Sequence, residues 1–567
     1  MSAEATDTAG GGAFTALDWT VLLGYFAGIT LFGLWLSRRV QSSGDYFLGD
    51  RKLPWWIMVG QSFGTGTNAE NPVAQTGASC QAGFSTIWYQ WKNMLITPFY
   101  WLMAPWYRRS GRTTIGEIIE DRYGRAMALL YTVFALAFFV FNQGAMLKGG
   151  AKIIAVATGG DMISPNGVVV AMTVAFIVYS FFGGLIASAY TDFVQGLLII
   201  LLSFLLIPPG LRAVGGLSGL RETLPPEFFQ LYSEASGVGL FAIAMLALNG
   251  VVGITAMPHS LAMNATGRTE RAGRIGQTYG SLVKRFCTIG WAFTGLIVAA
   301  LLVRNGDHLP DMEHAFGYAS LHLLGPGLVG LMVACVLAAN MSTCSNFMVN
   351  TGALFTNNLY KTYLRPNASD RDLLWVGRVS GLGLTLAGVG FALMVDQVLQ
   401  AFLFTETIAA LMGIMFLGGF LWPRANRHGA LAATLASFAV YFGFNVLRTG
   451  RVQLVYKWEA DVFGAAMLAG AGAFVVVSLL TPPENPARMD AFFARLRRSS
   501  DGDEAEGGPP AALRGQDLLM LDAPGWFRRE RWRGFWSRYR EDCAGFGLAW
   551  VTAGLLVALA WAVTRLG

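Results

Sequence analysis

Long runs of apolar residues, separated by short polar segments, occupy most of the chain. A helix needs about 20 apolar residues to cross the hydrocarbon core of a bilayer, and about fourteen runs approach that length. They begin near Phe14, Leu53, Phe84, Met127, Pro165, Tyr190, Val238, Gln277, Pro326, Leu373, Val398, Gly429, Asp461 and Ala544. The pattern predicts an all-α integral membrane protein with about 14 transmembrane helices.

Two of these runs are interrupted in the middle by glycines and polar residues, at 64–68 and at 249–253. Unwound backbone leaves N–H and C=O groups without partners in hydrocarbon, so a break persists only where it is buried or lines a wet cavity. Each interrupted run opens a block of five spans, an arrangement typical of transporters built from two inverted repeats. We therefore expect broken helices on both sides of a binding site at mid-membrane.

The charged residues predict how the spans are oriented. The first twelve residues include Glu4 and Asp7 but no Lys or Arg, so the basic region of a cleavable signal peptide is missing and we expect the first span to be retained. Arg38 and Arg39 follow that span, which places its carboxyl end in the cytoplasm, and roughly three quarters of the loop Lys and Arg then lie on the same side. An even number of spans puts both termini outside, in a multi-pass protein of the cell inner (cytoplasmic) membrane.

Composition narrows the function classes. A chain with 54% hydrophobic and 13% charged residues cannot bury its apolar surface in soluble cores, and the net charge of +6 is explained by the basic loops without nucleic acid as a partner. The five cysteines show no metal-binding spacing. We find no Ser-His-Asp ordering, metal-ligand cluster or paired acids, so the sequence does not favour an enzyme.

The predicted organisation has six parts. They are an extracytoplasmic tail, first span and cytoplasmic loop (1–52), a first five-helix repeat (53–214), a second, inverted repeat (238–422), two accessory spans (428–480), a basic and aromatic cytoplasmic loop (481–542) and a last span (543–567). The first half of the 481–542 loop has linker composition. Its second half interleaves arginines with aromatic rings from Trp526 to Arg540, which favours a helix lying on an anionic inner leaflet over a docking site for a protein partner, whose identity stays unknown.

One span carries hydroxyls at a spacing that suits an ion. Ala339, Ser342 and Thr343 lie at i, i+3 and i+4, on one helix face. The break in the second span offers free carbonyls near Gly64 and Thr67. About five neutral oxygens without a carboxylate suit a monovalent cation better than Ca²⁺ or Mg²⁺, so we expect sodium. The alternative is that both hydroxyls bond back to their own helix.

Four ordered motifs resemble the sodium:solute symporter family, which contains sodium-coupled sugar, proline and pantothenate carriers. They are Gly44–Trp56, Gly183–Gln195, Ala338–Tyr360 and Trp422–Ala430, and the resemblance runs from the first span to the twelfth. It implies the LeuT-type fold of five plus five inverted helices, with the first helix of each repeat broken. It also implies a sodium ion held by Gly64, Thr67, Ala339, Ser342 and Thr343.

The resemblance further implies where other functional residues lie. Asp192 matches an aspartate near the sodium exit path of the family, although an acid at this place can also cap a helix at the interface. By likeness to the sugar carriers, the residues at solute positions are Asn71, Tyr89, Gln90, Asn93, Asn249 and Lys284.

The solute pocket departs from that of the bacterial sugar carriers. Gln90 stands where those carriers have a glutamate, and Val252 where they have a gating tyrosine. An amide-rich pocket suits hydroxylated neutral solutes, so we expect sodium-coupled import of a sugar or sugar-like compound by alternating access. Lys92 and Lys284 could instead pair with a carboxylate, so a sugar acid, a monocarboxylate or an amino acid is an alternative substrate. A transporter-like solute receptor is an alternative function.

Overall fold

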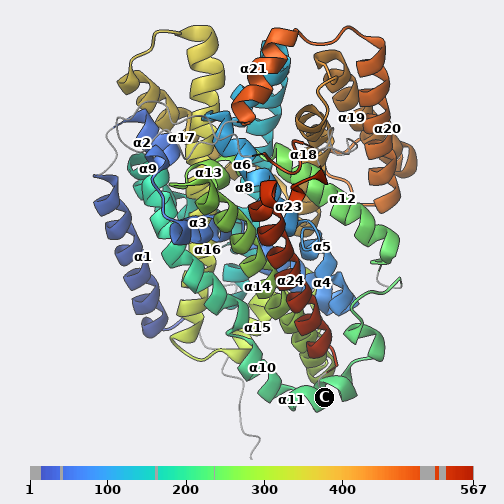
Figure 1. The fold of residues 1–567 in the computed structure, drawn as a ribbon. Coiled ribbons are helices and arrows are strands. Elements are labelled where there is room, and N and C mark those ends of the chain that lie inside the picture. Colours follow the sequence, from blue (N-terminus) through green and yellow to red (C-terminus); the bar gives the residue numbers. More distant parts are fainter. Residues whose placement is uncertain are drawn as a thin grey trace, which may run out of the picture.

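The protein is described here by a computed structural model that covers residues 14–38, 42–159, 164–234, 237–497, 517–522 and 532–565. Within these ranges the chain is helical, and its only β pairing is two isolated bridges (Figure 1). Ten described helices are long and apolar enough to cross a membrane. They are α1 (Ala16–Ser37), α8 (Arg125–Ala157), the second part of α9 (Pro165–Phe204) with α10 (Ile207–Ala213), α14 (Glu270–Asn305), α16 (Leu328–Leu354) with the π-helix η5 (Phe355–Leu364), α17 (Asp370–Met394), α18 (Val398–Leu421), α19 (Arg427–Thr449), α20 (Ala460–Leu480) and α24 (Arg540–Val563).

Helix α9 consists of two segments that run in opposite directions and meet at Gly184. This glycine has φ 55° and ψ −157°, outside the helical region, and a Cβ atom here would lie 2.6 Å from the Tyr46 ring. The first segment begins beside α1, since Val168 and Phe14 line one cavity. The second segment continues into α10, at the lower end of the molecule in Figure 1. The two predicted spans that begin near Pro165 and Tyr190 are therefore separated by a reversal that only glycine tolerates.

The first glycine cluster interrupts a helix, as the sequence predicts. Helix α3 (Trp55–Thr65) ends at the cluster, and four residues separate its end from the start of α4 (Glu70–Ala82). The chain then forms η2 (Phe84–Ile87), α5 (Trp88–Trp91) and α6 (Thr97–Ser110). A Cβ atom on Gly64 would lie 3.0 Å from the Asp192 Cβ atom, so glycine allows α3 to approach α9 closely at the break.

The second break lies elsewhere than the glycines suggest. Helix α12 (Leu240–Ala256) runs unbroken through 249–253, and the interruption falls at 257–259, before α13 (Ser260–Ala265). Pro258 explains this place, because proline disfavours helix in the preceding residue, and Met257 is indeed extended with ψ 121°. Gly250 serves packing instead, since a Cβ atom there would meet Asn93. The prediction of a break at 249–253 is therefore wrong.

The remaining helices are short and lie mostly in connections. They are α2 (Ser43–Leu48), η1 (Gly49–Arg51), α7 (Ile115–Tyr123), α11 (Gly216–Thr223), η3 (Pro226–Phe229), η4 (Met312–His314), α15 (Ala315–Leu323), α21 (Pro486–Leu496) and α23 (Phe535–Arg538). Helix α16 lies at the centre of the bundle, packed against α1, α8, α9, α17 and the end of α3. Helix α14 packs against both halves of the broken pair α3 and α4.

Part of the segment predicted as a linker is an ordered helix. In α21, Phe492 is buried and its ring lies 5.5 Å from that of Phe420 on α18. Arg109 donates to the carbonyl of Leu496 at 3.2 Å, and Arg495 pairs with Asp121 at 2.5 Å. Linker composition is therefore a wrong interpretation for 486–496, whereas Trp526 to Arg531 of the predicted surface helix lie outside the described residues.

A buried carboxylate joins the first helix to the central one. The Asp18 Oδ1 atom accepts the backbone N–H groups of Gly327 and Gly330, both at 2.7 Å, at the start of α16. Asp18 is 2% exposed, so these charge-assisted bonds are shielded from water.

We expect Asp18→Asn to lower the melting temperature by several degrees, because hydrogen bonds to a charged group contribute about 1.5–3 kcal/mol each. Thermal unfolding in detergent measures this. Asp396→Asn, which removes an exposed carboxylate between α17 and α18, is the matched control. Equal melting temperatures for both variants would show that Asp18 does not hold α1 to α16.

Candidate functional site

The end of α3 and the middle of α16 meet in a cluster of neutral oxygens. The Ser342 hydroxyl lies 3.1 Å from the Gly64 carbonyl oxygen and 3.0 Å from that of Ala339. The Thr343 hydroxyl lies 3.1, 3.2 and 3.4 Å from the carbonyl oxygens of Gly64, Thr65 and Ala339. All these residues are buried. The sequence-predicted alternative, in which the hydroxyls bond only within their own helix, does not describe this geometry.

The spacing of these oxygens suits a small cation. Ligands about 2.4 Å from an ion and at right angles to each other lie about 3.4 Å apart, close to the separations seen here. Thr67 joins the cluster differently from the prediction, because its N–H donates to the Gly64 carbonyl at 3.3 Å. Of the five predicted ion ligands, the structure thus brings together Gly64, Ala339, Ser342 and Thr343, and it adds the Thr65 carbonyl.

Asp192 lies directly behind this cluster. Its Oδ2 atom accepts the Thr65 hydroxyl at 3.3 Å, and the Thr65 carbonyl in turn accepts Thr343. Asp192 is fully buried in the second segment of α9, and its Oδ1 atom has no hydrogen-bond partner in the described part of the chain. A buried carboxylate with an unpaired oxygen is costly, so this position favours a role with a cation over a helix cap.

A cavity of about 70 Å³ adjoins the cluster. Ser62, Thr65 and Gly66 from α3 and its end form one wall. The rest comes from α4, α6, α8, α12, α13, α14, α16 and α18 and from the connections that contain Asn68, Asn93 and His259. Several polar atoms that line it are buried and bond to no described residue. They are Asn68 Oδ1, Glu70 Oε2, Asn93 Oδ1, His259 Nδ1 and Gln277 Oε1. Buried polar atoms are rarely left unpaired, so their convergence indicates a binding site for a polar molecule.

The cavity is also strongly charged. Lys92 pairs with Glu406 and also donates to Asn249 Oδ1 at 3.3 Å. Lys284 Nζ donates to the Gly66 carbonyl at 2.5 Å, where the last carbonyls of α3 favour a cation. Arg285 donates to the Gln90 carbonyl at 2.8 Å. Together with Glu70, these side chains supply three cations and two anions around one site.

The predicted solute residues fall into two groups. Asn93 and Lys284 line the cavity. Asn71 donates to Gln90 Oε1 at 3.4 Å and lies behind the cavity wall, and Asn249 is reached through Lys92. Tyr89 is half-buried and does not line the cavity. His259, which packs on Phe347 with ring centroids 5.2 Å apart, also lines it.

A loop that contains η4 covers α4, the second half of the broken helix. The Gly77 position of α4 approaches the Met312 carbonyl so closely that a Cβ atom would lie 2.7 Å from it. Lys152 of α8 pairs with Asp311 at 2.6 Å and with Glu313 at 2.5 Å. Burial raises the pKa of Asp311, but the hydrogen bonds from Lys152 and the Glu313 N–H and the nearby charges of Lys152 and His314 together lower it by more, so the net pKa lies below the usual value. This ionic contact joins η4 to α8.

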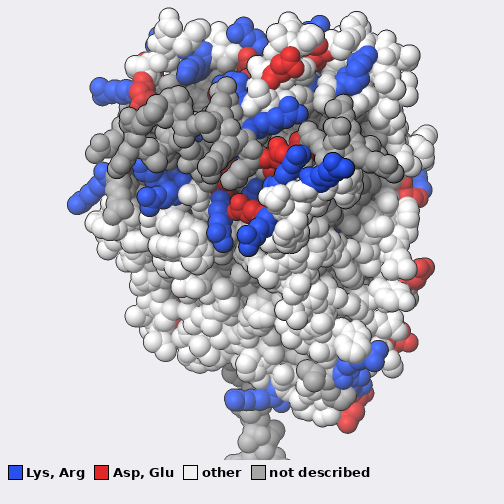
Figure 2. All heavy atoms as spheres, in the orientation of Figure 1, with Lys and Arg blue, Asp and Glu red and all other residues white. Residues whose placement is uncertain are grey.

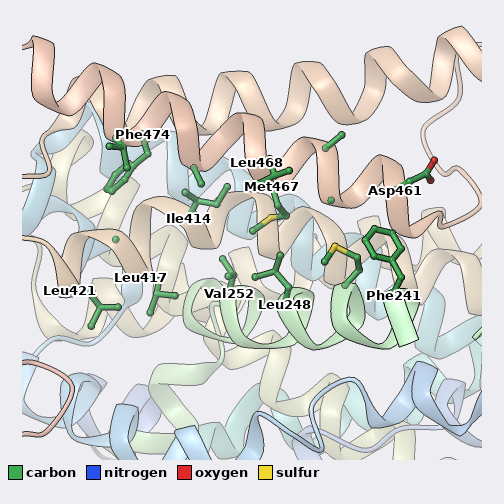
Figure 3. Close-up of a pocket in the computed structure, with 16 residues that line it drawn as sticks. Phe241, Leu248, Val252, Ile414, Leu417, Leu421, Asp461, Met467, Leu468 and Phe474 are labelled. Carbon is green, nitrogen blue, oxygen red and sulfur yellow. The ribbon is translucent and has the colours of Figure 1, made fainter. Parts of the chain in front are cut away.

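A larger cavity has the opposite character. Figure 3 shows the groove of about 720 Å³ between α12, α18 and α20, whose walls are carbon and sulfur atoms and which has Asp461 at one end. Phe241 and Leu468 on its rim are 58% and 77% exposed. Exposed apolar side chains on membrane-spanning helices face lipid, so this groove does not suit a polar solute.

Sequence reasoning missed Thr65, Glu70 and Arg285. Thr65 contributes a backbone oxygen, which any residue type supplies. Glu70 carried a signal, because an acid in an apolar span is costly unless it is functional or paired. Arg285 follows Lys284 directly, and the adjacent pair of cations in the apolar part of α14 could have been recognised in the same way.

Comparison with known proteins gives a consistent result. The model of the sodium:solute symporter family matches residues 46–437. The chain is similar to a sodium/glucose cotransporter of Vibrio parahaemolyticus, with 24% identity over 76% of this chain and 85% of that protein. It is likewise similar to a high-affinity proline transporter of Bacillus subtilis, with 26% identity over 83% and 98% of the two chains.

Among solved structures, the chain has the fold of a Na⁺-coupled sialic acid symporter. The TM-score is 0.70 at 19% identity, and the match covers 83% of this chain and 99% of the other. The family is one of sodium-coupled membrane transporters and not of enzymes. Because the family model matches more than half of the chain, the protein belongs to the sodium:solute symporter family.

Proposed function

We propose that the protein imports a small polar organic solute together with sodium, by alternating access between two inverted repeats. The repeats would comprise residues 53–214 and 238–422, within about fourteen spans. Three observations support this count. Together, α3 and α4 have the length of one span. The same is true of α12 and α13, and α9 consists of two spans that meet at Gly184. The arginine-rich end of the molecule would face the cytoplasm, with both chain termini outside.

The ion would bind where α3 ends against α16, held by Gly64, Thr67, Ala339, Ser342 and Thr343, with Thr65 as a further oxygen. The separations of 3.0–3.4 Å between the two hydroxyls and the carbonyl oxygens of Gly64, Thr65 and Ala339 support this assignment. Asp192 would lie on the ion path, separated from the ion-binding oxygens by Thr65. Sodium would tie α3 to α16 and hold the adjoining cavity in shape for the solute, so each ligand favours the state that binds the other.

The charged cavity favours a solute that carries a carboxylate. Lys284 forms no ion pair with a described carboxylate, and its ammonium group lines the cavity. Glu70 and the amides at Asn68, Asn93 and Gln277 would then bind hydroxyl or ammonium groups of the same molecule. A sugar acid or an amino acid combines these features. A neutral sugar is the second candidate, favoured by the amide of Asn93 in the cavity wall and by the amides of Asn71 and Gln90 behind it.

The sodium gradient would supply the energy for accumulation. One positive charge that moves inward through about 100 mV releases about 2.3 kcal/mol. A tenfold sodium gradient adds about 1.4 kcal/mol. Together these allow a gradient of a few hundredfold for a neutral or zwitterionic solute per sodium ion.

Thermal-shift measurements on the purified protein test both the coupling and the solute class. We expect sugar acids or amino acids to raise the melting temperature in sodium but not in potassium, since a ligand at 100 times its Kd stabilises by about 2.7 kcal/mol. Stabilisation by neutral sugars alone would overturn the carboxylate assignment and support the second candidate. Equal shifts in potassium would contradict sodium coupling.

A further inference from the structure

A second polar cavity, of about 860 Å³, lies between the start of α14, Trp101 of α6 and the segment that leads into α24. It is separate from the transport site and open to the surface. In Figure 2, blue and red side chains gather around α23 directly above a broad white band, on the face that this view presents. The cavity therefore lies where charged surface gives way to uncharged surface.

The floor of this cavity is fixed by buried contacts. Arg274 pairs with Asp542 at 2.5 Å, and both side chains are almost fully buried. The Trp101 indole donates to the Glu541 carbonyl at 3.1 Å, and the Arg274 guanidinium lies 5.7 Å from the Trp101 ring centroid. The Nε atom of Arg274 has no acceptor among the described residues. The pocket is thus held in shape by α6, α14 and α24 and retains one unused buried donor.

The rim is lined by arginines. Arg271, Arg538 and Arg540 are exposed, and none forms an ion pair with a described carboxylate. Two exposed acids, Asp517 and Glu541, also line the cavity. The other two lining acids are already neutralised, since Glu270 is held by Arg109 at 2.9 Å and Asp542 by Arg274. The three arginines and two acids that remain on the rim therefore give it a net charge of +1.

Apolar surface continues from the cavity along α24. Leu548 lines the cavity and is 57% exposed, and Val551 and Leu555 extend the same exposed surface along the helix. Trp536, beside the cavity on α23, is 62% exposed. Exposed tryptophan and arginine at the end of an apolar helix are typical of the headgroup layer of a bilayer.

We propose that this cavity binds the headgroup of an anionic phospholipid. The phosphate would contact Arg271, Arg538 and Arg540, with Arg274 as a buried donor, and an acyl chain would lie along Leu548 and α24. The rim arginines attract the negative charge, and the exposed apolar face selects a ligand with a hydrocarbon tail over free phosphate. In the proposed orientation, the lipid belongs to the inner leaflet.

Lipid binding to the delipidated, full-length protein tests this site. The triple variant Arg271→Gln, Arg538→Gln, Arg540→Gln should bind phosphatidylglycerol about a hundredfold more weakly than the wild type, at about fivefold per arginine. Arg538→Gln alone should show the fivefold step. Phosphatidylcholine with the same acyl chains should bind weakly to both proteins, and glycerol 3-phosphate to neither.

The matched control is Lys361→Gln, Arg365→Gln, Arg371→Gln, which removes three exposed cations outside the cavity. It should bind phosphatidylglycerol like the wild type. Equal weakening in both triple variants would indicate general surface charge, and equal binding of the two lipids would indicate no headgroup selection. Tight binding of glycerol 3-phosphate would assign the cavity to a soluble anion. Each of these results overturns the proposal.

Discussion

Replacing Ser342 and Thr343 together by alanine is expected to raise the sodium concentration needed for solute binding by about a hundredfold or more. Each hydroxyl lies within 3.1 Å of the Gly64 carbonyl, where the end of the broken helix α3 meets α16. A polar contact to a charged group contributes about 1.5–3 kcal/mol, so losing two costs about 3–6 kcal/mol of ion binding. Sodium titrations followed by melting temperature, at fixed solute, measure this effect.

A control separates ion binding from general damage to a helix. Thr434→Ala with Ser437→Ala removes two buried hydroxyls of α19 that donate to carbonyls of their own helix, at 3.1 and 3.0 Å. Within the described residues, the Thr434 hydroxyl also makes a weak contact with the Met415 sulfur, at 4.0 Å. This variant should keep the wild-type sodium requirement. If the Ser342 and Thr343 double variant did the same while still folded, the ion would have to bind elsewhere.

The first break could be predicted from sequence, and the second only in part. Glycines mark where a helix can end, but they also mark where two helices pack closely, and the sequence pattern does not distinguish these uses. At Gly64 both apply, since α3 ends there and touches Asp192. At Gly250 only packing applies, and the chain breaks at Pro258, whose ring and missing N–H impose the interruption directly.

The candidate site shows a similar division. The spacing of Ser342 and Thr343 on one helix face predicts that they act together, because helical periodicity is local information. The charged cavity is not local. Its wall contains contacts between residues that are far apart in the chain, such as Lys92 with Glu406 and Lys284 with Gly66. The periodicity of the sequence cannot predict such contacts. Glu70 and Arg285 could have been flagged as charges in apolar spans, but their convergence on one cavity required the fold.

The ion pair between Lys92 and Glu406 gives the second large prediction, on stability. Both side chains are almost fully buried, and the pair joins the segment after α5 to α18. Lys92→Met leaves the Glu406 carboxylate without its partner, and Glu406→Gln leaves an unpaired ammonium. Breaking one side of a buried pair costs about 3–5 kcal/mol, so each single variant should melt well below the wild type.

The double variant Lys92→Met with Glu406→Gln should recover much of this loss, because it leaves no buried charge unpaired. The exposed pair of Arg448 and Asp461, changed to Gln and Asn, is the matched control and should melt like the wild type. Melting temperatures of all variants in the same sodium buffer complete the cycle. Additive losses in the double variant would mean that Lys92 and Glu406 stabilise the protein through separate contacts. The cavity would then hold two independent charges, each able to meet an oppositely charged group of the solute.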